Sequence, residues 1–126
     1  MVNSNRFAAL AALLGGLAVI LGAFGAHALG DKVSAKDLDI WKTGAHYHLV
    51  HSVALLALCL WDREGKFRMV AWLWFVGILI FAGSLYALVL SQVRVMGAIT
   101  PIGGLCLIIG WLMLAVKLFR AGAEPG

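Results

Sequence analysis

Hydrophobic residues run through this chain in four long stretches that contain no Asp, Glu, Lys or Arg. The stretches are residues 7–29, 43–61, 69–93 and 95–116, and together they hold most of the 126 residues. A bilayer core about 30 Å thick is crossed by roughly 20 apolar residues in a helix. The pattern therefore predicts a single all-α integral membrane domain, a bundle of four transmembrane helices. The spans are expected at approximately 7–29, 43–61, 69–92 and 96–117.

The connection between the first two spans is the longest one, and its sequence favours a helix. Ser34 is typical of a helix N-cap, and Asp37 stands three residues later in the position of a capping box. A helix that begins near Ala35 would run into the second span, so a short helical segment is expected at the membrane interface. Leu38 and Trp41 should share one side of this segment, with Asp37 on another side.

The composition supports a membrane protein and excludes other classes. Hydrophobic residues make up 63% of the chain and charged residues 13%, which is too little charge for a soluble domain of this size. The net charge is only +4 and the basic residues are dispersed, so nucleic acid is not an expected partner. Cys59 and Cys106 lie inside predicted spans and have no partner at metal-binding or redox spacing. The lipid bilayer is the partner that this composition implies.

Basic residues outside the spans favour one orientation in the membrane. One side carries Arg6, Arg63, Lys66, Arg68, Lys117 and Arg120, and the other carries Lys32, Lys36, Lys42 and Arg94. Short loops that are rich in Lys and Arg stay in the cytoplasm. We therefore expect a multi-pass protein with both termini in the cytoplasm.

Small residues form a stripe along one face of the first span. They recur at intervals of three or four, as Ala11, Gly15, Ala18, Gly22 and Ala26. Helices in lipid associate by close van der Waals packing, which small residues permit. The stripe predicts contact with another helix of the same bundle, or alternatively with a second copy or another membrane protein.

Aromatic and basic residues near the span ends have a simpler interpretation. Trp61, Trp72, Trp74 and Trp111 are expected to face lipid or to form an interfacial belt. Arg94, in the short turn between the last two spans, is expected to be a snorkelling anchor.

Four sequence blocks, in order, resemble a known family. They are residues 22–29 (GAFGAHAL), Trp41-x-Thr43-Gly44-x-x-Tyr47-x-x-x-His51, residues 83–86 (GSLY), and residues 100–104 (TPIGG) with Gly110-Trp111. This series resembles domain of unknown function 423, a family of small bacterial membrane proteins to which human transmembrane protein 256 is similar. The family pattern commonly reads FSGSLY, where this chain has Ala82 in place of the first Ser, and His46 and His48 fall outside it. The resemblance implies a four-span protein of the bacterial inner membrane and no established activity.

Polar side chains gather in one half of the predicted membrane. At a rise of 1.5 Å per residue they lie within roughly 15 Å of the non-cytoplasmic surface. The candidate ligand-binding residues are His27, Tyr47, His51, Ser84, Tyr86 and Thr100. The spacing of Trp41, Gly44, Tyr47 and His51 predicts one shared helix face. Because the first two spans are joined directly, His27 and His51 are expected to approach the same polar space.

This polar set has four open interpretations. The side chains can clamp the bundle by hydrogen bonds between helices. They can instead bind or transport a small polar molecule, a lipid head group or a proton, with His27 and His51 as the protonatable groups. In the third interpretation, His27 and His51, with His48 nearby, bind a metal ion or haem. No Cys or carboxylate inside the spans completes a ligand set, so the identity of any cofactor is unknown. An enzyme is not expected, because Ser84 and His51 lack an acid to orient the imidazole.

From the sequence, the chain is thus a polytopic inner-membrane protein of unknown biochemical role. A non-enzymatic function in binding, transport or membrane assembly is the main expectation.

Overall fold

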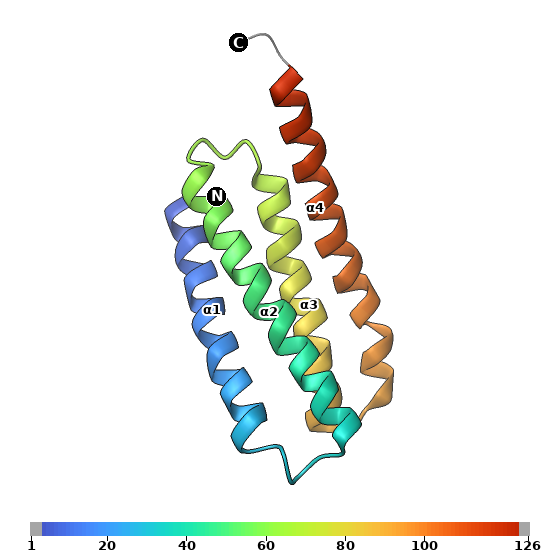
Figure 1. The fold of residues 1–126 in the computed structure, drawn as a ribbon. Coiled ribbons are helices and arrows are strands. Elements are labelled where there is room, and N and C mark those ends of the chain that lie inside the picture. Colours follow the sequence, from blue (N-terminus) through green and yellow to red (C-terminus); the bar gives the residue numbers. More distant parts are fainter. Residues whose placement is uncertain (1–3, 124–126) are drawn as a thin grey trace.

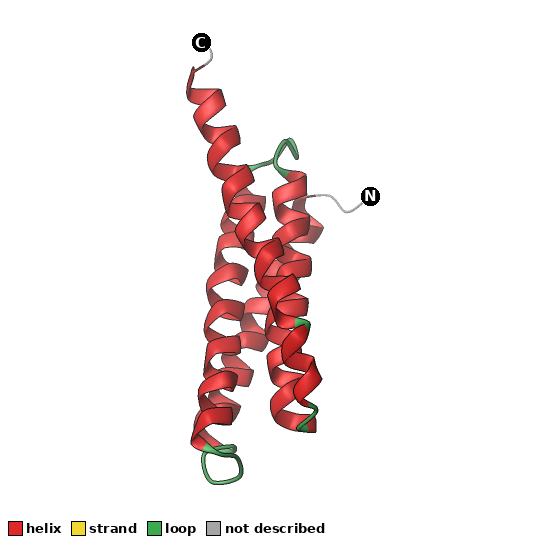
Figure 2. Ribbon diagram, turned by 90° about the vertical axis from the view of Figure 1, so that its right-hand side faces the viewer, coloured by secondary structure: helices red, strands yellow, loops and turns green. Residues whose placement is uncertain are grey.

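The computed structural model describes residues 4–123, and all regular structure in this range is helical. The long helices are α1 (Ser4–His27), α2 (Ala35–Trp61), α3 (Arg68–Ser91) and α4 (Thr100–Ala123), and a short 3₁₀ helix, η1 (Arg94–Ala98), precedes α4. These helices give four segments that are long and apolar enough to cross a membrane. The prediction of an all-α, four-helix membrane protein is therefore confirmed (Figures 1 and 2).

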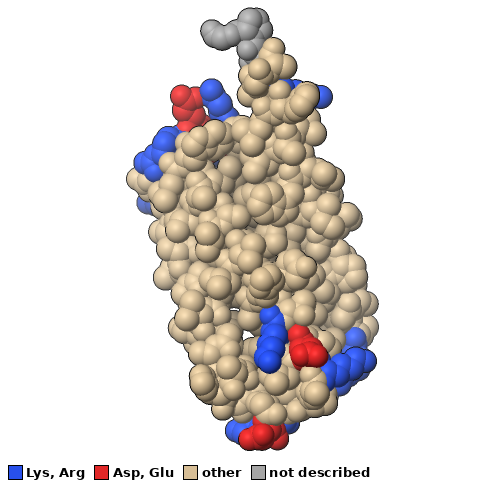
Figure 3. Space-filling view, viewed as in Figure 1, with Lys and Arg blue, Asp and Glu red and all other residues tan. Residues whose placement is uncertain are grey.

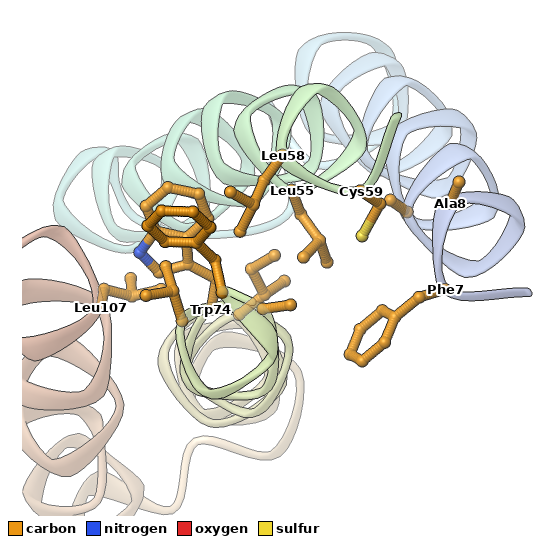
Figure 4. Packing of buried hydrophobic residues seen from close by; sticks show 12 residues of the cluster. Phe7, Ala8, Leu55, Leu58, Cys59, Trp74 and Leu107 are labelled. Atoms are coloured by element: carbon orange, nitrogen blue, oxygen red, sulfur yellow. The ribbon is translucent and has the colours of Figure 1, made fainter. Parts of the chain in front are cut away.

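The helices run alternately up and down and pack as an open strip. α2 and α3 form the centre, α1 packs against α2, and α4 packs against α3. α1 and α4 lie on opposite sides of this central pair (Figures 1 and 4). We call the upper end in Figure 1 the α2–α3 loop end and the lower one the α1–α2 loop end. On the face drawn in Figure 3, charged side chains group toward these two ends and leave an uncharged band between them.

The core draws buried side chains from all four helices. Figure 4 shows Phe7 of α1, Leu55 of α2, Trp74 of α3 and Leu107 of α4 in one cluster, and all four are buried. A second, smaller cluster lies toward the α1–α2 loop end and contains Leu29, Trp41, Leu88 and Val89. Trp74 is buried in the first cluster, so its expected lipid-facing position was wrong. Its size makes it the residue that fills the space where α3 meets α2 and α4.

Glycines let α4 lie directly on α3. A Cβ built at Gly103 would stand 2.8 Å from the Cα of Phe81, and one at Gly77 would stand 2.6 Å from a methyl of Leu107. A Cβ at Gly110 would stand 2.6 Å from Cδ1 of the Trp74 indole. Real Cβ atoms do not approach this closely. A Cβ at Gly103 would have to displace the α3 backbone, and one at Gly77 or Gly110 would have to displace the Leu107 or Trp74 side chain. The contact follows the rule for helices in lipid, where close packing replaces the hydrophobic effect.

The small-residue stripe of α1 contributes to packing within the chain only in part. Ala11 and Ala18 are buried, and a Cβ at Gly15 would make ordinary contact with Ser52 of α2 at 3.8 Å. Gly22 has no atom within 4 Å of such a Cβ, so the expected close contact does not extend to this residue. The tight approach occurs instead at Gly25, under the Trp41 ring. An interface of this face with another chain stays a prediction.

The first turns of α2 begin at the predicted residue, but a different side of the helix faces the core. The Ser34 hydroxyl accepts a hydrogen bond from the Asp37 backbone N–H at 3.1 Å, so Ser34 is the N-cap. Asp37 is only 3% exposed and lies on the same buried side as Trp41, so the expectation that it points elsewhere was wrong. Burial of a carboxylate requires partners. Arg94 supplies two hydrogen bonds, at 2.9 and 3.3 Å, and Gln92 supplies one at 2.8 Å. The sequence did not indicate this pairing of Arg94, and its expected role as a snorkelling anchor stays a prediction.

This ion pair leads to a test at the α1–α2 loop end. Replacing Arg94 with Ala leaves the buried Asp37 carboxylate with one side-chain donor, and an underbonded buried charge is destabilising. We expect a clear fall in the Tm of the detergent-solubilised protein. Lys42→Ala removes an exposed charge on the same helix as Asp37 and should leave the Tm nearly unchanged. Equal Tm values for the two variants would show that the pair does not stabilise the fold.

Candidate functional site

His51 joins α2 to α4 through both nitrogens of its ring. Its Nδ1 lies 2.8 Å from the Tyr47 carbonyl oxygen, and its Nε2 lies 2.9 Å from Nε1 of Trp111. The indole N–H can only donate, so Nε2 accepts and Nδ1 carries the proton that is donated to the carbonyl. The geometry therefore holds a neutral imidazole with both nitrogens satisfied. Trp111, which the sequence suggested to be a belt residue, is half of this contact.

His48 forms a second contact, between α2 and α3. Its Nδ1 lies 2.9 Å from the hydroxyl of Tyr86; His48 comes from the middle of α2 and Tyr86 from the last quarter of α3. His48 is buried, and its Nε2 has no hydrogen-bond partner within residues 4–123. The sequence blocks omit His48, although it lies four residues after Gly44 and seven after Trp41, on the same buried face of α2.

Ser84 and Thr100 form a third contact, between α3 and the start of α4. Their hydroxyl oxygens are 2.5 Å apart, and the Ser84 hydroxyl also lies 3.0 Å from the carbonyl oxygen of Phe81. Thr100 is the first residue of α4, and its hydroxyl lies 3.5 Å from the Met96 carbonyl oxygen. Each of the three contacts thus links two different helices.

The structure does not bring His27 to this set. His27 is the exposed last residue of α1. Trp41 donates to the Leu21 carbonyl at 2.8 Å, which fixes the level at which α1 and α2 pass each other. From that level His27 lies toward one end of the bundle and His51 toward the other, so they are roughly 20 Å apart along the axis. A single metal ion cannot bind both imidazoles.

The six candidate residues therefore separate into different environments. Tyr86 bonds to His48, Ser84 bonds to Thr100, and His51 bonds to Trp111. Tyr47 is partly exposed, and its ring stacks against His51 with centroids 6.1 Å apart. Because its neighbours are Thr100 and a carbonyl group, Ser84 has no imidazole base as a partner. The part of the chain that the structure describes holds no group of three His, Cys, Asp or Glu side chains suited to a metal ion.

An open groove runs between α2 and α4 beside these contacts. One part has a volume of about 350 Å³ and is lined by Ala54, Ala57, Leu58, Trp61, Trp74, Trp111, Leu114 and Leu118. The other part, about 310 Å³, is lined by Tyr47, His51, Phe81, Gly104, Leu107, Ile108 and Trp111. Trp111, which donates to His51 across the space between α2 and α4, borders both parts and stands between them. We call the two parts together the α2–α4 groove. Its walls are almost entirely apolar.

Comparison with known proteins assigns the chain to a family. Residues 21–104 match the family model described as Protein of unknown function (DUF423). The chain belongs to this family. All six candidate residues fall within the matched range, whereas Trp111 lies beyond it. The resemblance inferred from the four sequence blocks is thus confirmed.

Relatives from several bacteria are named UPF0382 membrane proteins. A UPF0382 membrane protein of Staphylococcus saprophyticus is 47% identical over 116 residues, which cover 90% of this chain and 97% of that protein. The UPF0382 membrane protein YwdK of Bacillus subtilis is 45% identical over 118 residues, covering 90% and 96%. A relative from Haemophilus influenzae is 44% identical over 119 residues, covering 93% and 96%. No solved structure matches this chain. DUF423 proteins are thus membrane proteins of unknown function.

Proposed function

We propose that this DUF423 protein is a non-enzymatic lipid-binding protein that holds one acyl chain in the α2–α4 groove. The observation that carries the proposal is the groove itself, two apolar hollows between α2 and α4 that lie on either side of the Trp111–His51 contact. Its two parts have volumes within the range of small-molecule sites. The protein would lie in the bacterial inner membrane with both termini in the cytoplasm, as the basic residues suggest.

The polar contacts favour a groove ligand over a polar ligand among the helices. Both ring nitrogens of His51 are hydrogen-bonded to protein atoms, and the hydroxyl groups of Ser84 and Thr100 are hydrogen-bonded to each other. A polar ligand would have to break these bonds, and a buried group left without its partner costs about 1–3 kcal/mol. We therefore assign the polar side chains a structural role as clamps between helices, and the binding role to the groove.

The shape of the groove suits an acyl chain. Its lining extends on α4 from Gly104 to Leu118, and fourteen residues of helix measure roughly 21 Å. One leaflet of a bilayer core is about 15 Å deep, so an extended chain fits along the groove. Ala54 and Ala57 have small side chains, which leave the groove open on its α2 side. The buried side chains of Trp74 and Leu58 form the bottom of the groove. An ordinary convex helix surface that faces lipid has no such walls to hold an acyl chain.

Filling the groove tests the proposal. Ala57 is exposed and borders the open volume, so Ala57→Phe should occupy the groove without disturbing the core. Native mass spectrometry of the protein with added dioleoyl phosphatidylcholine should show one retained lipid for the wild type. We expect Ala57→Phe to reduce this population several-fold, because the new ring takes the place of the acyl chain.

The matched control is Ala12→Phe, which adds the same ring at an exposed position of α1 outside the groove. It should retain the lipid as the wild type does. An unchanged lipid population in Ala57→Phe would contradict the proposal. So would a lipid-free dimer of the wild type that Ala57→Phe converts to monomer, because the groove would then receive a helix from a second copy.

A further inference from the structure

A second hollow, the polar pocket, lies beside the α2–α4 groove at the α2–α3 loop end. Trp61 borders the groove and also lines this pocket, which has a volume of about 270 Å³. The other residues that line it are Asp62, Arg63, Glu64, Lys66 and Phe67. An apolar channel and a polar pocket that share one wall match the two parts of an amphiphilic molecule. Trp is favoured at the depth where lipid head groups begin.

Lys117 of α4 does not line this pocket but contacts two of the residues that do. Its Nζ donates to the Lys66 carbonyl oxygen at 3.2 Å and stands 5.6 Å from the centroid of the Phe67 ring. An ammonium group has three donors. The carbonyl uses one of them, so Lys117 can donate to a further acceptor at the mouth of the pocket.

The acidic residues of the pocket are already engaged. The Asp62 carboxylate accepts the backbone N–H groups of Lys66 at 2.9 Å and Phe67 at 2.7 Å, which fixes the turn. Glu64 pairs with Lys66 at 3.1 Å, with both side chains largely exposed. Arg63 is exposed and forms no ion pair within residues 4–123. Arg63 and Lys117 are therefore the cations available to an anionic ligand.

Building on the proposed function, we infer that the groove selects an anionic phospholipid. Its phosphate contacts Arg63 and Lys117 at the polar pocket, and one acyl chain passes Trp61 and runs along the α2–α4 groove. The α2–α3 loop end is the end predicted to face the cytoplasm, where anionic lipids attract Lys and Arg. With Lys117, the cations Arg63, Lys66 and Lys117 outnumber the carboxylates Asp62 and Glu64 here, so the pocket favours a negative head group.

Lipid competition tests this selection on the full-length protein in detergent. The probes are dioleoyl phosphatidylglycerol and dioleoyl phosphatidylcholine, and retained lipid is measured by native mass spectrometry. The wild type should prefer phosphatidylglycerol. Lys117→Gln and Arg63→Gln should each reduce the preference about fivefold, as expected for one basic residue near an anionic head group. Arg120→Gln removes the same charge at the same end of α4. Lys117, and not Arg120, contacts Lys66 and Phe67 of the pocket, so Arg120→Gln should retain the preference.

Each outcome bears on the inference separately from the proposed function. Equal losses in Lys117→Gln and Arg120→Gln would indicate a diffuse charge effect and overturn the inference. If the wild type retains both lipids equally and Ala57→Phe loses both, the anionic selection fails while the groove proposal stands. If lipid retention does not depend on Ala57, the groove proposal itself fails.

Discussion

Replacing Gly103 with Ala is expected to destabilise the bundle strongly, whereas the same change at the neighbouring Gly104 should be tolerated. The new methyl at residue 103 would meet the backbone of Phe81, with its Cα at 2.8 Å, and the backbone cannot move aside cheaply. A methyl at residue 104 would stand 3.5 Å from the Phe81 ring, an ordinary contact distance. Overpacking of this kind costs about 1–3 kcal/mol or more.

The pair of variants controls for the intrinsic effect of alanine. Both residues lie in α4, so both substitutions gain about 1 kcal/mol of helix propensity. The difference in the free energy of unfolding, measured by SDS titration in mixed micelles, therefore reports the α3–α4 contact. Equal stability of the two variants would mean that α4 does not approach α3 as closely as the glycines indicate.

The number and extent of the helices follow from the sequence because lipid leaves the backbone few options. An uncharged segment inside a bilayer must form all its backbone N–H···O=C hydrogen bonds within the protein, and a helix forms them within the segment itself. Residues 69–93 and α3 accordingly coincide within two residues at either end. The segment before the second span was also predictable, since Ser34 caps a helix that runs unbroken to Trp61.

The buried face of α2 was harder to predict. Lipid is as apolar as a membrane protein core, so hydrophobicity does not distinguish inside from outside. Spacings of three and four residues from Trp41 and Gly44 allow either Tyr47 or His48 as the next core position. Tyr47 was predicted to lie on the buried face, yet His48 is the buried residue and Tyr47 is partly exposed. His48 takes the buried position because its imidazole bonds to Tyr86, a partner that is distant in sequence.

Long-range relations account for the remaining differences. Asp37 and Arg94 are 57 residues apart, and only the packed bundle places them together. The expected approach of His27 and His51 assumed that Thr43 marks the end of the second helix. α2 begins at Ala35 instead, eight residues earlier, which moves His51 roughly 12 Å further from the helix end. The groove arises because α4 packs mainly against α3 and meets α2 at Trp111 and His51, an arrangement that no local pattern encodes.

Replacing Trp41 with Ala should cause the largest loss of stability in the α1–α2 half of the bundle. Trp41 is 1% exposed, packs against Phe24 and Tyr86, and donates to the Leu21 carbonyl. Removing a buried Trp costs about 3–5 kcal/mol. Trp41→Phe keeps most of the ring and loses the hydrogen bond, so it should cost about 1 kcal/mol plus a small packing term. Chemical or thermal unfolding in detergent measures both.

A double-mutant cycle with Gly25 shows whether this ring is what requires the glycine in GAFGAH. A Cβ at Gly25 would stand 2.7 Å from Nε1 of Trp41, so Gly25→Ala should destabilise the wild type by about 1–3 kcal/mol. In the Trp41→Ala background the same methyl enters vacated space and should cost nothing, which gives a coupling energy above about 1 kcal/mol. Additive effects of the two substitutions would show that Gly25 is needed for another reason. Strong coupling would establish Trp41 as the contact that fixes α1 against α2, and thereby the level that keeps His27 away from the contacts of His48 and His51.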